Sequence, residues 1–178
     1  MKLLYTLKDN EFPFKGIDNK RDISRGVIYN DNNQIALIHL LGDDMFGHRD
    51  YLETPGGGKD KNETFKEALI REIKEELGAS IDNIKEIGRV KDYYNLLKRE
   101  NNNHYYLAHL VSINEDTNLC NYEKRLFHEI KWIDIDEIDE VYKNIKRTPI
   151  SNLVINRELK ILQLARKMIK EKQIDNKR

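Results

Sequence analysis

The order of hydrophobic patterns along the chain predicts an α/β protein with a mixed sheet and helices on its faces. Runs of β-branched and aromatic residues, separated by turn residues, recur from the N-terminus to residue 133. Helical spacing of apolar residues appears after the glycine-rich stretch and again from residue 136 onward. Because no internal repeat or linker interrupts these patterns, we expect the 178 residues to form one domain.

The charge balance and the single cysteine exclude several classes of protein. Lys plus Arg and Asp plus Glu both number 31, so the basic excess of a nucleic-acid-binding protein is missing, and we expect no stable nucleic-acid binding. Cys120 alone excludes an internal disulfide. The first residues are charged too early for a signal peptide, and no run reaches the ~18 apolar residues of a membrane span. We therefore expect a cytoplasmic protein that makes no use of a membrane.

The N-terminal third is predicted to begin with a short strand, Leu3–Leu7, and a polar arm that ends at Arg21. Two β-rich runs follow, Ile23–Tyr29 and Gln34–Leu40, and the four Asn and Asp residues between them favour a hairpin. The segment Gly42–Asp50 is predicted to be a polar loop.

The second half is predicted to contain strands Ile84–Tyr94 and His104–Ile113, joined by a polar connector at Lys98–Asn103. Another polar segment, Asn114–Lys124, precedes a strand at Glu129–Ile133.

Helical spacing then begins at Asp136 and is interrupted by Pro149. A last amphipathic helix is predicted over Asn156–Lys172, with a frayed tail from Ile174.

The stretch Thr54–Gly58 reads Thr-Pro-Gly-Gly-Gly and predicts irregular backbone, because proline lacks a ladder donor and glycine is permissive. Such a loop is either a plain strand-to-helix turn or a place where backbone approaches a ligand. Since no Gly-Lys-Ser/Thr ends it, it is not a Walker-type phosphate loop. The next helix should begin with Asn62 or Thr64 as N-cap and end at Gly78.

Three carboxylates stand on one face of that helix, since Glu72, Glu75 and Glu76 are spaced i, i+3 and i+4. Two carboxylates ~6 Å apart repel by ~3 kcal/mol at an effective dielectric of ~20, and a bound cation reverses this. Glu72 and Glu76 fall beside the apolar stripe of the helical wheel, and Arg71 is placed to pair with Glu75 and Glu63. The charge pattern leaves two interpretations open, a seat for a hard divalent cation and a solvated acidic face.

The glycine stretch and the acidic helix also share a fixed spacing of residues. Gly57 is followed after five residues by Glu63, after seven more by Arg71-Glu72-Ile73, and then by Glu75-Glu76 and Gly78. This spacing resembles the Nudix box of the Nudix hydrolase superfamily. Every fixed position is met, and the one departure is Ala79, where the family prefers a bulkier aliphatic residue. The likeness covers roughly residues 23–138.

The resemblance implies an α/β/α sandwich around a mixed β-sheet, here with an additional C-terminal helix. The parts would be an N-terminal strand and arm (1–22), a core (23–138) and a helix (151–172) of a single Nudix domain (1–178). It also implies a hydrolase that uses Mg²⁺ or Mn²⁺ to cleave a diphosphate linkage in a nucleotide derivative.

The resemblance implies roles for particular residues. The metal ligands would be Gly57, through its carbonyl, Glu72, Glu75 and Glu76. Arg71 and Glu63 would orient them. The general base would be Glu76, with Glu123 and Glu129 as alternatives on a later loop. The predicted substrate-binding residues are Arg25, Arg49, Gly57, Gly58 and Tyr94, of which the arginines suit phosphate and the tyrosine suits stacking on a base.

Two alternatives stay open. A nucleotide-sensing Nudix domain would bind without cleaving, and an isoprenoid isomerase of the same fold would need a cysteine near the metal, whereas Cys120 lies far along the chain. The sequence does not separate ADP-ribose, nucleotide sugars, dinucleoside polyphosphates and oxidised nucleoside triphosphates as substrates. The sequence does not determine the oligomeric state, and the resemblance leaves a homodimer open, because many relatives dimerise through the regions before and after the core.

Overall fold

The computed structural model describes residues 1–114, 116–148 and 150–175, apart from the side chains of Tyr122, Glu123 and Asp175. The strands are β1 (Leu3–Lys8), β2 (Asn19–Tyr29), β3 (Gln34–Asp44), β4 (Gly47–Glu53), β5 (Gly56–Gly58), β6 (Ala79–Tyr94), β7 (Arg99–Ile113) and β8 (Phe127–Asp134). The helices are α1 (Phe65–Leu77), α2 (Asn121–Leu126), α3 (Ile138–Asn144) and α4 (Ser151–Asp175). Within the described ranges, no helix is long and apolar enough to cross a membrane.

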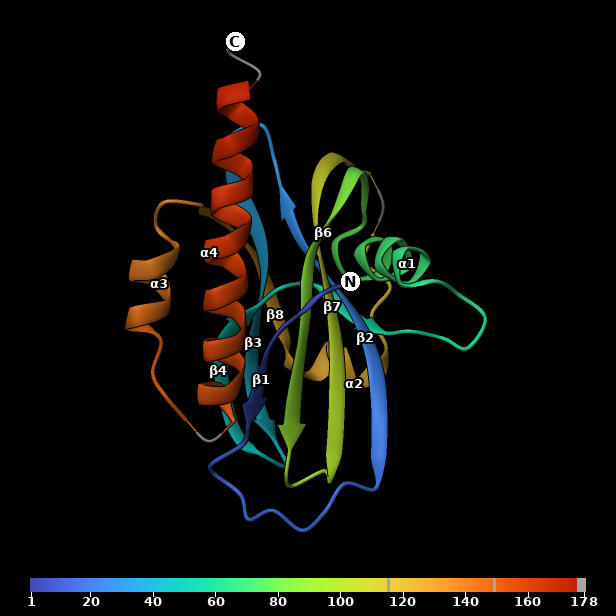
Figure 1. Ribbon diagram of the computed structural model, residues 1–178, viewed down its shortest axis with the longest axis vertical. Coiled ribbons are helices and arrows are strands. Elements are labelled where there is room, and N and C mark those ends of the chain that lie inside the picture. Colours follow the sequence, from blue (N-terminus) through green and yellow to red (C-terminus); the bar gives the residue numbers. More distant parts are fainter. Residues whose placement is uncertain (115, 149, 176–178) are drawn as a thin grey trace.

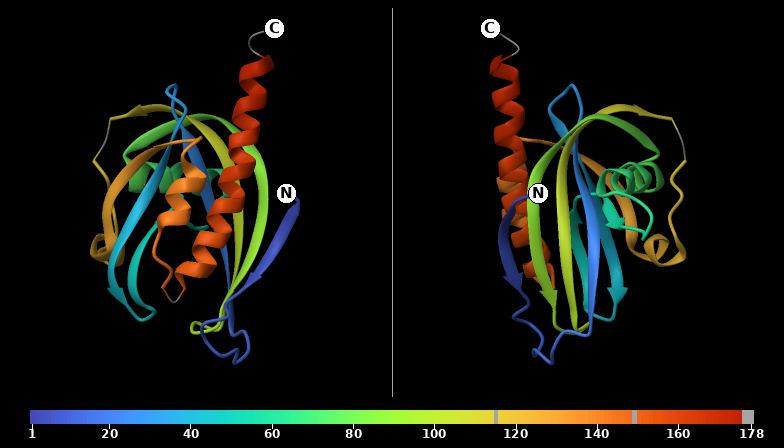
Figure 2. Two further views of the ribbon diagram at one scale, coloured as in Figure 1. Left: turned by 90° about the vertical axis from the view of Figure 1, so that its left-hand side faces the viewer. Right: turned by 45° about the vertical axis from the view of Figure 1, so that its right-hand side comes forward.

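The strands form one mixed sheet in the order β1-β6-β7-β2-β3-β4, with β5 paired to β2 and β8 paired to β3. The β1–β6 and β2–β7 pairs are parallel, and the others are antiparallel. Helix α1 packs on one face, and α3 and α4 cover the other (Figure 1; Figure 2). The predicted α/β/α sandwich with a mixed sheet and a C-terminal helix is therefore confirmed.

Each face of the sheet buries its own apolar core. The core under α1 joins residues of β2 and β3 to the helix, as with Ile28, Ile38 and Leu69. The core under α4 includes Leu37 of β3 and Ile161 of the helix. Neighbouring residues of β3 thus point to opposite faces, as the strand period of two requires.

Strands β2 and β3 diverge directly after their hairpin, and Tyr29 and Ile35 are the one residue pair in register between them in the described structure. Farther along, β2 pairs through Ile23–Arg25 with β5, while β3 pairs with β8. The sheet is therefore open between these two strands, and the opening lies beside the C-terminal part of α1.

Two predicted irregular segments are strands. The predicted loop Gly42–Asp50 contains the end of β3 and the start of β4, which pair from Ile38↔Glu53 to Asp44↔Gly47. The prediction failed because polar side chains on an edge hairpin hide the pairing of its backbone. The glycine stretch, predicted to be irregular, forms β5, since its backbone groups find partners on β2.

Other boundaries also differ from the predicted ones. Part of the predicted polar segment Asn114–Lys124 belongs to α2, and β7 begins at Arg99 inside the predicted connector. The last helix starts at Ser151 rather than Asn156, and Ile174, predicted to fray, is still helical. These segments are stabilised by tertiary contacts, which override a weak local pattern.

Candidate active site

Helix α1 has a defined start and stop. The Thr64 side chain accepts a hydrogen bond from the Glu67 N–H, and the Glu67 carboxylate accepts one from the Thr64 N–H, which completes a capping box. Gly78 ends the helix in the left-handed conformation, with φ of 61°. The predicted N-cap at Thr64 and the stop at Gly78 are confirmed. The residues that α1 buries are Ala68, Leu69, Glu72, Ile73, Glu76 and Leu77.

Arg71 forms ion pairs with three carboxylates, two on α1 and one just before it. Arg71 Nη2 lies 2.7 Å from Glu63 Oε1, and Arg71 Nη1 lies 2.8 Å from Glu72 Oε1 and 3.2 Å from Glu75 Oε2. We call these four residues the Arg71 cluster. The predicted pairing of Arg71 with Glu63 and Glu75 is present, and Glu72 joins it.

The same guanidinium also ties the helix to the glycine stretch. Arg71 Nη2 donates to the Gly58 carbonyl at 2.9 Å. Because Arg71 remains 31 % exposed while Glu72 is nearly buried, the cluster lies at the boundary between core and solvent.

The glycine stretch touches both buried carboxylates. The Gly56 N–H donates to Glu76 Oε2 at 2.6 Å. A Cβ atom on Gly57 would lie only 2.5 Å from the Glu72 carboxyl group, so a larger residue would displace that carboxyl group. Glycine at position 57 therefore lets the backbone approach the Glu72 carboxylate closely.

Glu76 is the acid whose ionisation the fold perturbs most clearly. Burial raises the pKa of Glu76 well above its ordinary value, and the neighbouring Glu72 charge raises it further. The Gly56 N–H and Arg25 act in the opposite direction but do not compensate. A buried carboxylate with a second acid beside it favours a bound proton or a bound cation.

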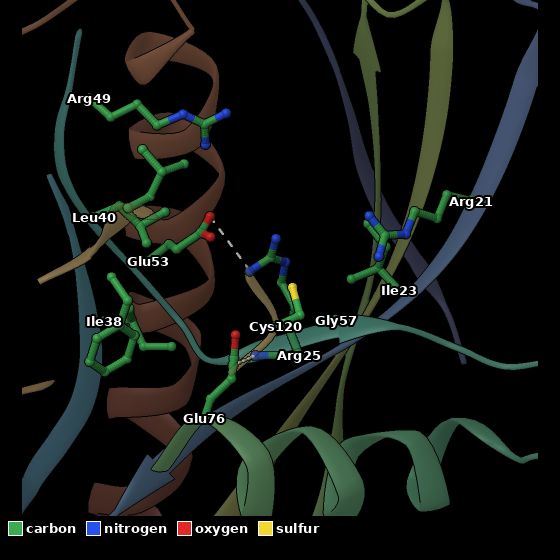
Figure 3. Close-up of a pocket in the computed structure, with 13 residues that line it drawn as sticks. Arg21, Ile23, Arg25, Ile38, Leu40, Arg49, Glu53, Gly57, Glu76 and Cys120 are labelled. Carbon is green, nitrogen blue, oxygen red and sulfur yellow. Dashed lines mark hydrogen bonds and ion pairs between the residues drawn. The ribbon is translucent and has the colours of Figure 1, made fainter. Parts of the chain in front are cut away.

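A pocket of about 260 Å³ fills the opening between β2 and β3 (Figure 3). Glu76 enters it from α1, Arg25 from β2, and Arg49 and Glu53 from β4. The full lining is Arg21, Ile23, Arg25, Ile38, Leu40, Arg49, Glu53, Gly56, Gly57, Glu76, Cys120, Leu126 and Phe127.

A second hollow adjoins this pocket and shares Arg21 and Cys120 with it. Its lining includes the remaining predicted site residues on α1 and β5, which are Gly58, Arg71, Glu72 and Glu75. The carboxylates of α1 therefore stand between a pocket with cationic walls and an outer acidic hollow.

The two predicted phosphate-binding arginines line the pocket, but neither is an ordinary surface cation. Arg25 is buried, donates to the Thr54 carbonyl at 3.0 Å, and lies 3.6 Å from Glu53 Oε2. Arg49 forms an ion pair with Asp44 and donates to the Tyr51 hydroxyl at 2.8 Å. Fixed guanidinium groups of this kind are preorganised for an anionic ligand.

The structure places Tyr94 outside the pocket lining. Its ring packs edge-on against Phe46, and its hydroxyl accepts from Arg157 Nη1 at 3.3 Å. Because Tyr94 is buried with its hydroxyl occupied, it has no surface for stacking on a base, and we no longer assign it to substrate binding.

Glu129 also lies away from the pocket. It pairs in register with His39, whereas the flanking Ile38 and Leu40 line the pocket from the other face of β3. Glu129 is therefore not placed to act as base at this pocket. The side chain of Glu123, the other later-loop alternative, lies outside the described residues.

Glu53 is a pocket residue that the sequence reasoning did not single out. Its carboxylate is held between Arg25, at 3.6 Å, and the fully buried Arg157 of α4, at 3.1 Å. The available signal was its place two residues before the proline of the glycine stretch.

Arg157 gathers a second set of acids behind the pocket. Arg157 Nη1 lies 2.7 Å from Asp92 Oδ2, and its Nε lies 2.8 Å from Glu158 Oε1. With Glu53, these residues form what we call the Arg157 cluster. It had no local sequence signal, because its members come from β4, β6 and α4.

Glu158 links the Arg157 cluster to the glycine stretch. Its Oε2 accepts from the Thr54 N–H at 3.0 Å and from the Thr54 hydroxyl at 2.7 Å. Burial alone would raise the pKa of Glu158, but Arg157, Arg25 and these hydrogen bonds hold it below its ordinary value. Glu158 is thus an ionised, buried anchor for the residue that precedes Pro55.

Cys120 lies at the pocket although it is distant in sequence. The loop before it is tied to α1, since the Asn118 N–H donates to the Glu75 carbonyl at 2.7 Å. The distance of Cys120 along the chain therefore does not separate it from the carboxylates in space.

Comparison with known proteins identifies the family. Residues 20–153 match the family model for the NUDIX domain, which covers most of the chain, so the protein belongs to the NUDIX family. It is a Nudix hydrolase, an enzyme of the pyrophosphohydrolase class.

The similar proteins differ in their named activities. The chain is 30 % identical over 122 residues to an RNA pyrophosphohydrolase of Hydrogenovibrio crunogenus, covering 60 % of this chain and 74 % of the relative. It is 37 % identical over 59 residues to an 8-oxo-dGTP diphosphatase of Escherichia coli, covering 33 % of this chain and 44 % of that relative. A NUDIX hydrolase structure from Nitrosomonas europaea matches with a TM-score of 0.58 at 21 % identity, covering 76 % of this chain and 86 % of that one.

Proposed function

We propose that this protein is a metal-dependent hydrolase that cleaves a diphosphate linkage in a nucleotide-derived substrate. The observation that carries the proposal is the convergence of acids and arginines on one pocket. Glu76 lies across it from Arg25 and Arg49, so one side suits a cation and the other suits phosphate oxygens.

The donor set fits a hard divalent cation such as Mg²⁺ or Mn²⁺. Glu72, Glu75, Glu76 and the Gly57 carbonyl supply only oxygen atoms, which these ions prefer. The buried Glu72 and Glu76 carboxylates repel each other, and a Cβ at Gly57 would displace the Glu72 carboxyl group. When bound, such an ion neutralises diphosphate charge and lowers the pKa of a coordinated water.

The residues of the chain would divide the remaining work. Arg71 positions Glu72 and Glu75 through its ion pairs. Arg25 and Arg49 would bind non-attacked phosphate oxygens and orient the substrate for in-line attack. Glu76, whose pKa is raised, is our first choice as the base that takes the proton of the attacking water. Glu53, in the same pocket, is the alternative base.

The substrate class can be narrowed by a direct assay. Two relatives are named RNA pyrophosphohydrolase and 8-oxo-dGTP diphosphatase, which supports testing RNA and 8-oxo-dGTP beside ADP-ribose, nucleotide sugars and dinucleoside polyphosphates. The zero net charge favours a substrate recognised at its phosphates over tight binding of a long RNA.

The test uses purified protein, Mg²⁺ or Mn²⁺, and a panel containing each of these classes, including a short 5′-triphosphorylated RNA. We expect phosphate or pyrophosphate release that EDTA abolishes, with the product identifying the attacked phosphorus. Nucleotide binding without turnover would indicate the sensing domain instead. No turnover and no binding would overturn the proposal.

Cys120 offers a check on the isomerase alternative, because it lines the pocket. A hydrolase whose nucleophile is water does not need the thiol. We therefore propose that Cys120→Ser retains hydrolysis of the best substrate. An isomerase that used this thiol would instead lose its reaction on an isoprenoid diphosphate.

A further inference from the structure

A β-bulge on the opposite face of β3 brings three metal-binding side chains together. His39 pairs with Glu129, but the next residue, Leu40, pairs with Phe127, so His128 is an extra residue in β8. A bulge of this kind turns two successive side chains toward the same face of the sheet. His128 and Glu129 therefore both lie near His39, although neighbours in a regular strand would point apart.

The ring of His39 is oriented by a carboxylate on one side and faces another carboxylate on the other. Its Nε2 lies 2.8 Å from Asp50 Oδ1, and its Nδ1 lies 3.5 Å from Glu129 Oε1. Among the described residues, Nδ1 is buried and has no hydrogen-bond partner. With Asp50 accepting from Nε2–H, Nδ1 presents its lone pair to the Glu129 carboxylate. In this tautomer the two acceptors repel each other unless a proton or a metal ion lies between them.

His128 determines which cation fits this position best. Its ring lies edge-on to that of His39, with centroids 5.2 Å apart and planes at 88°. One ligand atom from each of His39, His128 and Glu129 lies within 4.8 Å of the others. A proton shared by His39 and Glu129 would leave His128 without a role, whereas a metal ion uses all three.

We infer that His39, His128 and Glu129 form a second metal site, selective for a transition metal of the Zn²⁺ class. Two imidazoles and one carboxylate are ligands that suit Zn²⁺, in contrast to the all-oxygen set on α1. Ligand distances of ~2.0–2.2 Å require the three side chains to close slightly around the ion. The side chains of His128 and Glu129 are exposed, while the Asp50 contact holds the partly buried His39 in place.

The neighbouring charge is compatible with such a site. Lys131 Nζ lies 3.3 Å from Glu129 Oε1, but its side chain is 38 % exposed and can turn into solvent. The ion would link β3 to β8, which together supply Ile38, Leu40 and Phe127 to the pocket wall. Its expected role is to stiffen that wall from behind, separate from the carboxylates of α1.

The test is a Zn²⁺ titration of tag-free protein by calorimetry, with Mg²⁺ present at saturating concentration. We expect one equivalent of Zn²⁺ to bind, and His128→Ala to weaken binding by about tenfold or more. The matched control is His48→Ala, since His48 is another exposed histidine, paired with Asp43 at the far end of β4. It should leave Zn²⁺ affinity unchanged.

Two further measurements separate this site from the carboxylates of α1. Asp50→Ala should weaken Zn²⁺ binding by about tenfold, because the His39 ring loses the oxygen that accepts from its Nε2–H and orients it. Bound Co²⁺ should show visible absorption that His128→Ala removes and Glu75→Gln retains. Zn²⁺ affinity that is unchanged in His128→Ala, or that is lost in Glu75→Gln instead, would overturn the inference.

Discussion

The Arg71 cluster and the Arg157 cluster use the same chemistry in different surroundings. Each consists of one arginine and three carboxylates at ion-pair distance. Arg71 is 31 % exposed, and its acids open onto a hollow that solvent reaches. Arg157 is fully buried, and it shares Glu53 with the active pocket.

This difference in burial suits one cluster to ligand binding and the other to stabilising the fold. Acids at the edge of solvent can exchange an arginine contact for a metal ion at little cost, because surface ion pairs contribute only ~0–1 kcal/mol. Buried ion pairs cannot be opened without leaving an uncompensated charge. The Arg71 cluster is thus suited to hold ligands, and the Arg157 cluster is suited to hold the pocket in shape.

The largest expected effect is on folding stability. Arg157→Ala should lower the free energy of unfolding by about 3–5 kcal/mol, since the buried Asp92 and Glu158 carboxylates lose their counter-charge. Arg71→Ala, the matched control, should lower it by clearly less, because Arg71 and Glu75 already reach solvent and only Glu72 is buried. Urea unfolding followed by circular dichroism measures both. Equal losses in the two variants would remove the distinction between the clusters.

The next largest effect is on turnover. Glu76→Gln should lower kcat at least about a hundredfold, which is ~2.7 kcal/mol of transition-state stabilisation, without loss of fold. Glu67→Gln on the same helix is the control, because glutamine also completes a capping box. The kcat of each variant is measured from initial rates on the substrate of the panel that the natural protein hydrolyses fastest. If Glu76→Gln retains activity, the role assigned to Glu76 is wrong.

A smaller effect is expected for the orienting arginine. Arg71→Lys keeps the charge but loses the fork that reaches Glu63, Glu72 and the Gly58 carbonyl together. The Mg²⁺ concentration for half-maximal rate should rise about tenfold. A fall in kcat with unchanged Mg²⁺ dependence would place Arg71 in contact with substrate instead.

The smallest effect concerns pH and the metal-free protein. The folded-state pKa of Glu76 is raised, so the fold favours the protonated carboxyl group. At acidic pH Glu76 is protonated and the free energy of unfolding keeps its full value. As pH rises through the raised pKa, the buried group ionises and the free energy of unfolding falls. In EDTA, Glu76→Gln should therefore have a higher Tm than the natural protein at pH 8, and the difference should vanish near pH 4. A constant difference across pH would exclude Glu76 as its source.

Local signals predicted the acidic helix well. Thr64, Gly78 and the spacing of the glutamates specify the start, the end and one face of α1 through interactions within a few residues. The pairing of Arg71 with Glu63 and Glu75 follows from the same helical spacing.

Residues brought together across the sheet were not predictable in this way. Glu53 and Cys120 reach the pocket because β2 and β3 separate and the Asn118 backbone docks on α1. Tyr94 and Glu129 were assigned to the site from type and position alone. Pairing of β8 with β3 places Glu129 beside His39, on the face of the sheet opposite to the pocket. Packing against Phe46 buries Tyr94.

The family, the helix and the acids on it were thus predictable from residue spacing, because each depends on a short segment of the chain. Which side chains face those acids depends on the folded arrangement of β2, β3 and α4. That arrangement also decides that Arg157 and Glu158, unremarkable in a helical pattern, hold Glu53 and Thr54 from behind. Long-range strand register and burial set these contacts, and no local pattern encodes them.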